Sequence, residues 1–212
     1  MKYHPIWGDG DPLTLDILKK IKPRGVWLDL AAGDGRYVPE LLSTVERLVA
    51  LDINKESLEK IQSLVKKKDS NRFQTVIGDF TAPLPFSKQY FDGVFCTGTL
   101  HCFPLPTVKK VFGYMDAILK PGGTIILDFA TDIVRDFEAR EKTHAKKTKT
   151  LPSSYVGPGY TKQEAKKFLD GLFMGYEVTM HQSTFKDDVR RVPGYGFKAK
   201  GRYWLVVGIK PE

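Results

Sequence analysis

The chain has 212 residues, of which 33 are Lys or Arg and 25 are Asp or Glu, for a net charge of +8 at pH 7. This length suffices for one well-buried core and is short for two, so we expect a single domain over residues 1–212. The charge is compatible with an anionic partner. No apolar run approaches the roughly 18 residues of a membrane span, and no signal-peptide pattern opens the chain, so we expect a cytoplasmic protein without a membrane partner.

The two cysteines, Cys96 and Cys102, are too few for a disulfide framework or a zinc quartet, and they do not form a C-x-x-C pair. We expect both to be buried, reduced thiols that behave as small apolar side chains. We predict no metal site.

The first part of the chain alternates short apolar runs with segments of helical periodicity. Residues 1–22 open with an aromatic, glycine-rich stretch that we interpret as a lid and continue as a helix over 12–21. Five apolar runs of strand length follow, over residues 26–30, 47–51, 73–77, 91–98 and 124–129. The helices between them cover residues 37–45, 54–66 and 105–119. This βαβ series predicts a parallel sheet with helices on both faces.

The regular alternation of strand and helix patterns ends after the fifth predicted strand. Residues 131–160 form a polar insertion, helix-like over 132–149, that we place near the substrate site. A capping box then begins a helix over 161–172. Two final strands, 176–185 and 202–209, are expected to pair antiparallel. The fold class is therefore α/β, a doubly wound, Rossmann-like, mostly parallel seven-stranded sheet with an antiparallel last strand.

A small-residue turn follows the first strand. Asp29 ends the apolar run, and Ala31, Gly33 and Gly35 then lead into the helical pattern. Such a turn lets a ligand touch bare backbone beside the positive end of a helix. We therefore expect a ligand at this turn.

Acidic residues stand at the ends of three successive strands. After Asp29, Asp52 ends the second strand about 20 residues beyond the glycine turn, where a carboxylate can accept both hydroxyls of a ribose. Asp79 follows the third strand. A nicotinamide dinucleotide would favour a third glycine in the turn, but Val38 stands there, which argues against a dehydrogenase.

With these residues the chain resembles the class I S-adenosylmethionine-dependent methyltransferases. Residues 29–35 match the first motif of that family, with Ala31 in the first glycine position, residues 78–80 match its third motif, and residues 119–123 match its approach to the fifth strand. The resemblance implies S-adenosylmethionine as cofactor. It assigns to the cofactor the following residues: Asp29, Ala31, Gly33, Gly35, Arg36, Asp52, Ile53, Asp79, Phe80 and Thr97.

Within this resemblance, Gly33 and Gly35 lie beside the methionine and ribose portions, Asp52 binds the ribose, and Asp79 accepts from the adenine amino group. Thr97 to His101 stands where the family lines the transferable methyl. His101 is the candidate general base or substrate-orienting residue. An equally consistent interpretation is a half-buried histidine that begins a helix.

Residues around the expected cleft suggest where an acceptor binds. Tyr3 and Trp7 in the lid and Thr131 after the fifth strand are our candidate substrate contacts. The fourth strand lacks the Asn/Asp-Pro-Pro-aromatic signature of enzymes that methylate base amines. Cys96 lies inside an apolar strand, which argues against a nucleophilic role.

The acceptor class has more than one interpretation. We expect transfer to an N, O or S nucleophile of a small molecule. Residues 190–203 interleave cations with aromatics, so an RNA substrate is an alternative, as is an ordinary solvated loop. A non-catalytic cofactor-binding module is a further alternative for the function. For the oligomeric state we expect a monomer or a homodimer.

Overall fold

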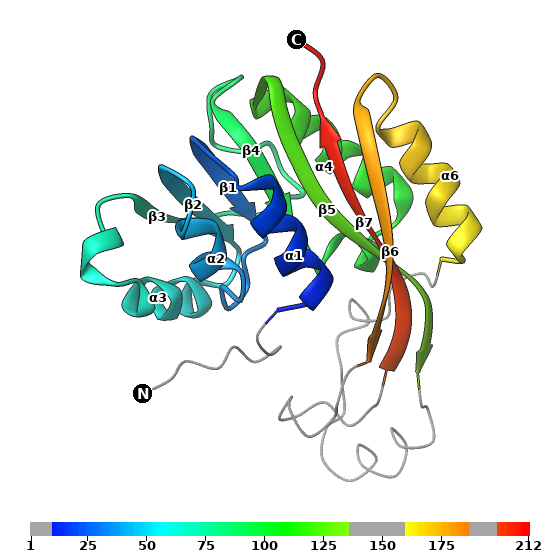
Figure 1. Cartoon of the computed structure of the whole chain (residues 1–212), viewed down its shortest axis with the longest axis horizontal. Helices are drawn as coiled ribbons and strands as arrows, with labels where there is room; N and C mark the ends of the chain where they lie inside the picture. Colours follow the sequence, from blue (N-terminus) through cyan, green and yellow to red (C-terminus); the bar gives the residue numbers. More distant parts are fainter. Residues whose placement is uncertain (1–9, 136–159, 187–198) are drawn as a thin grey trace, which may run out of the picture.

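A computed structural model describes residues 10–135, 160–186 and 199–212. It contains one seven-stranded sheet in the order β3-β2-β1-β4-β5-β7-β6 (Figure 1). The strands are β1 (Val26–Leu30), β2 (Arg47–Asp52), β3 (Phe73–Ile77), β4 (Phe91–Cys96), β5 (Leu119–Arg135), β6 (Glu177–Lys186) and β7 (Ala199–Ile209). The helices are α1 (Pro12–Ile21), α2 (Val38–Leu42), α3 (Lys55–Leu64), α4 (Leu105–Ile118) and α6 (Lys162–Leu172), with short 3-10 helices η1 (Lys67–Asp69) and η2 (Leu100–Cys102). None of the described helices is long and apolar enough to cross a membrane.

The strand directions confirm the expected fold class. β1 to β5 pair in parallel, and β7 runs antiparallel to both of its neighbours, β5 and β6. The chain first builds the sheet outward from β1 to β3 and then crosses back to place β4 on the other side of β1. Ligands of open α/β sheets bind at such a reversal, beyond the carboxyl ends of the strands. The candidate site therefore lies at the ends of β1 and β4.

Helices cover both faces of the sheet, as alternating strand residues require. Leu28 and Leu30 of β1 belong to a core packed by α4 and α6. Trp27, on the opposite face of the same strand, packs with α1, α2 and α3. Figure 1 shows α1 crossing in front of the sheet and α4 behind it. This alternation means that Asp29 points to the face covered by α1 and α2.

Local sequence signals set several element boundaries. The side chains of Asp11 and Asn54 accept backbone N–H groups at the starts of α1 and α3. The capping box formed by Thr161 and Glu164 begins α6 as expected. Helix α2 ends at Leu42, earlier than the predicted 45. The cause is Arg72, which donates to carbonyl oxygens at that end, as described below.

The structure corrects our reading of the chain after the fifth strand. Strand β5 runs 17 residues, from Leu119 to Arg135, so residues 132–135 are strand and the helix-like reading of them was wrong. The physical reason is pairing with β7, which continues to Arg135 opposite Ala199. Figure 1 shows β5, β6 and β7 extending well beyond the other strands. The rest of the predicted polar insertion, 136–159, lies outside the described residues, as do residues 190–198 of the basic segment 190–203.

Candidate functional site

The turn after β1 adopts the backbone conformation that its small residues allow. Ala31, Gly33 and Gly35 have φ angles of 59°, 55° and 77°. Ala31 therefore takes the left-handed conformation expected of a glycine, at some cost in strain. A Cβ added to Gly33 would meet no described atom within 4 Å, whereas one added to Gly35 would come within 2.8 Å of Ile61. Open space thus borders the turn at Gly33, and Gly35 is required for packing against α3.

Asp52 joins this turn to the end of β2. Its Oδ2 accepts the N–H of Gly33 over 2.8 Å, and its Oδ1 accepts the N–H of Asn54 over 2.8 Å. The next residue, Ile53, is 70% exposed, which is unusual for a large apolar side chain. A fixed carboxylate beside an exposed apolar side chain suits a ligand with a sugar diol and a flat apolar ring.

Asp29 is buried at the end of β1, only 4% exposed. Burial, and then the nearby negative charge of Asp52, raise the pKa of its carboxyl, and the positive charge of Arg36 opposes both effects, so that the pKa is about 7. The guanidinium of Arg36 also lies over the ring of Tyr37, 5.7 Å from its centroid. Arg36 is therefore a cation that acts on the carboxyl of Asp29 at this edge of the sheet.

Asp79 and Phe80 follow β3 in a tight turn. Asp79 Oδ1 accepts from the N–H and the hydroxyl of Thr81, over 2.8 and 2.7 Å, and these hydrogen bonds lower the pKa of the Asp79 carboxyl. The side chain is exposed. The ring of Phe80 is partly buried and packs edge-on against Phe103 at 5.2 Å. Asp79 thus presents an ionised carboxylate at the same edge of the sheet as Asp52.

A further carboxylate, Asp128 of β5, was missing from our sequence-based candidates. Its Oδ1 accepts the N–H of Gly98 over 2.6 Å, directly after the candidate Thr97 at the end of β4. Burial raises the pKa of Asp128 and the Gly98 N–H and the charge of Arg36 lower it, so that the pKa is about 6. The available signal was an acidic residue within the otherwise apolar run 124–129. The pattern of that run is typical of a continuous core strand, so it predicts functional residues only after the strand.

The remaining candidate site residues lie in different structural environments. His101 is partly buried in η2, the 3-10 helix directly after the β4 loop. Thr131 is fully buried, and its hydroxyl lies 3.4 Å from the Arg202 carbonyl oxygen of β7. We therefore leave Thr131 out of the acceptor site that we propose below. Tyr3 and Trp7 lie outside the described residues.

The cysteines differ from each other. Cys96 is buried at the end of β4, and burial raises its thiol pKa well above the usual value, consistent with the expected packing role. Cys102 in η2 is only partly buried, contrary to our expectation. Within the described residues, no group of three or more His, Cys, Asp or Glu side chains is arranged to hold a metal ion.

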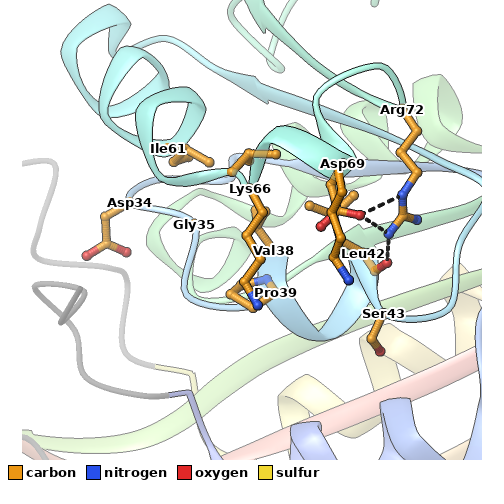
Figure 2. Close-up of a pocket in the computed structure, with 12 residues that line it drawn as sticks. Asp34, Gly35, Val38, Pro39, Leu42, Ser43, Ile61, Lys66, Asp69 and Arg72 are labelled. Carbon is orange, nitrogen blue, oxygen red and sulfur yellow. Dashed lines mark hydrogen bonds and ion pairs between the residues drawn. The ribbon is translucent and has the colours of Figure 1, made fainter. Parts of the chain in front are cut away.

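A hollow of about 350 Å³ lies on the α2 and α3 side of the glycine turn (Figure 2). Its walls include Val38, Leu42 and Ile61, and it shares only Asp34 and Gly35 with the turn itself. The guanidinium of Arg72 closes one end of it by pairing with Asp69 and donating to the carbonyl oxygens of Leu42 and Val45. The strand-end carboxylates do not line this hollow, so we do not assign the chemistry to it.

Comparison with known proteins points to a family for part of the chain. Residues 28–123, from β1 into β5, match the model of a family described as a methyltransferase domain. No curated protein matches the chain significantly in sequence. The matched region is somewhat less than half of the chain, and together with the strand order it supports a class I S-adenosylmethionine-dependent methyltransferase.

Solved structures share the fold of this chain along most of its length. The YcgJ protein of Bacillus subtilis is 16% identical, with a TM-score of 0.66 over 95% of this chain and 100% of that one. A SAM-dependent methyltransferase from Aquifex aeolicus is 16% identical, with a TM-score of 0.56 over 94% of both chains. The DhpI-SAM-HEP complex is 20% identical, with a TM-score of 0.58 over 94% of this chain and 85% of that one.

The family match and the likeness of fold cover different parts of the chain. The matched residues end at Gly123, so they include the glycine turn and the acids after β1, β2 and β3 but omit Asp128. Most of β5 and all of β6 and β7 lie beyond the match. The part of the sheet beyond the match therefore has to be interpreted from its own residues.

Proposed function

We propose that this methyltransferase binds S-adenosylmethionine across the ends of β1 to β4 and methylates an N, O or S nucleophile of a small-molecule acceptor. One observation carries the proposal: Gly33, beside open space, donates its N–H to the Asp52 carboxylate at the reversal of the strand order. The bare backbone of the turn and a fixed acid for the ribose are thus joined in one unit.

The residues present fit the cofactor. Asp52 is oriented to accept ribose hydroxyls, with the exposed Ile53 beside it for the adenine ring. The ionised, exposed Asp79 suits the adenine amino group, and Phe80 next to it provides an apolar edge. The remaining members of the proposed site are Ala31, Gly35, Asp29, Arg36 and Thr97. When bound, S-adenosylmethionine supplies a methyl group activated by its positively charged sulfonium.

The protein's contribution to such a transfer is mainly positioning. Holding a nucleophile in line with the methyl and the sulfur accounts for much of the rate of a displacement reaction. The loop from Thr97 to Gly98 is fixed by Asp128 and would form one wall for the acceptor. His101, just beyond this loop, is our candidate for orienting the acceptor or for removing a proton where the nucleophile carries one.

The charge at this edge favours a small acceptor over RNA. The described side chains there are mostly carboxylates, and the cations whose charges act on them are Arg36 and, at Asp79, Lys110. A polyanion would meet like charge. RNA binding remains an outcome of the test, because the basic residues Arg190, Arg191 and Lys198 lie outside the described residues.

Isothermal titration calorimetry with S-adenosylhomocysteine tests the cofactor site. We expect micromolar binding to the wild type and a loss of more than tenfold in Asp52→Ala. Asp170→Ala serves as the control, because Asp170 is an exposed carboxylate that pairs only with Lys166 of the same helix. Absence of binding to the wild type, or equal binding to all three proteins, would refute the site.

Salt-dependent binding to tRNA fragments tests the acceptor class. If the acceptor is a small molecule, reversing the charges of Arg190, Arg191 and Lys198 leaves methyl transfer into low-molecular-weight products unchanged. If affinity for RNA instead falls steeply with salt and is lost in the charge-reversed variant, the acceptor is RNA.

A further inference from the structure

Asp128 is the strand-end carboxylate to which the proposed cofactor site gives no role. Its neighbours Leu127 and Phe129 lie in the core packed by α4 and α6. Because successive strand residues point to opposite faces, Asp128 faces the α1 and α2 side of the sheet, as Asp29 does. The two carboxylates therefore stand on the same face, on either side of β4.

The strand order places Asp128 relative to the cofactor, if the proposed function holds. Neighbouring strands lie about 4.8 Å apart, and β3, β2, β1, β4 and β5 follow one another across the sheet. Asp79 and Asp52, the proposed adenine and ribose anchors, follow β3 and β2. The sulfur end of the cofactor then extends toward β1 and β4. Asp128 is one strand farther along the same line, on the side from which an acceptor would approach.

The contact with Gly98 fixes the carboxylate at this position. Asp128 Oδ1 accepts the Gly98 N–H over 2.6 Å, and Gly98 is exposed with a φ angle of 76°. Among the described residues, no hydrogen bond is found to the second oxygen, Oδ2. One oxygen thus holds the β4 loop, and the other is left to face a ligand.

The charges around Asp128 leave this region negative. The positive charge of Arg36 acts on both Asp29 and Asp128, so one guanidinium is shared by two carboxylates. Asp11, before α1, adds a further negative charge. Among the described residues, the charge of Asp128 also raises the pKa values of Tyr37 and Cys96. A positively charged ligand atom is therefore favoured here over a neutral one.

We propose that Asp128 makes the site prefer a positive centre at the point of transfer, so that the protein binds the sulfonium donor more tightly than the thioether product. Transfer breaks the bond between sulfur and the methyl carbon, leaves that electron pair on sulfur and forms the bond from the methyl to the acceptor nucleophile. Sulfur thereby loses its positive charge. The attraction to Asp128 then disappears, which favours exchange of product for donor.

Calorimetry with three ligands tests this role. S-adenosylmethionine carries a sulfonium, sinefungin carries a protonated amine at the corresponding place, and S-adenosylhomocysteine is neutral there. In Asp128→Asn the amide oxygen still accepts the Gly98 N–H, so only the charge is lost. We expect the two positively charged ligands to bind about tenfold more weakly and S-adenosylhomocysteine to change less than twofold, with Asp170→Asn matching the wild type. Equal losses for all three ligands, or no loss, would overturn the proposal.

A pH series on the unmodified protein provides a second measurement that does not depend on the variant folding. The pKa of Asp128 is raised to about 6, so the ratio of the affinities for S-adenosylmethionine and S-adenosylhomocysteine should fall several-fold from pH 7.5 to pH 5. Asp29 also titrates in this range, and the part of the fall that disappears in Asp128→Asn belongs to Asp128. A ratio that is independent of pH would overturn the proposal.

The two proposals fail in different ways. If the wild type binds none of the three ligands, the cofactor site itself is wrong. If it binds all three with equal affinity at pH 7.5, the cofactor site stands and only the role of Asp128 is refuted.

Discussion

Gly33 donates its backbone N–H to Asp52 Oδ2 over 2.8 Å, so the turn after β1 and the carboxylate after β2 form one hydrogen-bonded unit. Both oxygens of Asp52 accept backbone N–H groups, the second from Asn54. An asparagine has only one acceptor oxygen and must leave one of these donors without its partner. We expect Asp52→Asn to lower the free energy of unfolding by about 1–2 kcal/mol and the affinity for S-adenosylhomocysteine about tenfold. Urea unfolding and calorimetry measure the two effects, and unchanged affinity would contradict the ribose assignment.

The two glycines of the turn should respond differently to alanine. At Gly35 a Cβ would come within 2.8 Å of the buried Ile61, and the φ angle of 77° adds strain. We expect Gly35→Ala to cost about 2–4 kcal/mol of stability. At Gly33 the Cβ would enter open space, so Gly33→Ala should cost only about 1 kcal/mol, for the strained φ angle.

Comparison of Gly33→Ala with Gly35→Ala separates an effect on stability from an effect on ligand binding. Gly33→Ala should remain folded and yet lose most of its affinity for S-adenosylhomocysteine, because the added methyl would occupy the space assigned to the cofactor. Thermal denaturation and calorimetry on the two variants give the comparison. If Gly33→Ala binds as well as the wild type, the cofactor does not lie against Gly33.

Arg72 is expected to stabilise the protein by capping α2. Its guanidinium donates to the carbonyl oxygen of Leu42 and pairs with Asp69 (Figure 2). It also donates to the carbonyl oxygen of Val45. Lysine cannot reproduce this fork of donors. We expect Arg72→Ala to lower the free energy of unfolding by about 2–3 kcal/mol and Arg72→Lys to recover less than half of that loss. Affinity for S-adenosylhomocysteine should change less than twofold. A large change would mean that the structure around the hollow beside α2 affects ligand binding at the strand ends.

The buried carboxyl of Asp29 makes stability depend on pH. Its pKa is raised to about 7, whereas an unfolded aspartate titrates near 4, so the folded state holds the extra proton between these values. The contribution of Asp29 to stability is therefore greatest below about pH 4 and is lost as pH rises toward 7, by about 1.4 kcal/mol per pH unit.

Asp29→Asn should remove this dependence. Relative to the wild type, the variant should gain about 2–3 kcal/mol in the free energy of unfolding when pH is raised from 5 to 7.5. Urea denaturation at the two pH values measures the difference. A variant that follows the same pH curve as the wild type would show that Asp29 is ionised throughout.

Much of the fold follows from local patterns in the sequence. The five apolar runs end where the acids and glycines stand, and Asn54 and the Thr161 capping box begin helices as expected. These features depend on residues close together in the chain. The turn at residues 31–35 was predictable for the same reason, because only small residues tolerate its φ angles.

Features that depend on distant partners were not predictable. The early end of α2 is set by Arg72, which lies 30 residues after the Leu42 whose carbonyl it caps. The length of β5 is set by β7, some 70 residues later. Asp128 was overlooked because its role comes from contact with Gly98 on a neighbouring strand, 30 residues earlier, and nothing next to it in the sequence shows that contact.

The extension of β5 beyond β4 has a consequence for how such a protein can diversify. The last pair between β4 and β5 is Cys96 with Leu127, and beyond it the described backbone of β5 pairs with β7. Among the described residues, Asp128 is the side chain in this part of β5 that hydrogen-bonds to the loop after β4, so substitutions beyond Asp128 leave that contact and the pairing of β1 to β4 in place. We therefore expect the projecting ends of β5, β6 and β7 to vary between related enzymes while the parallel strands that carry the proposed cofactor site stay the same.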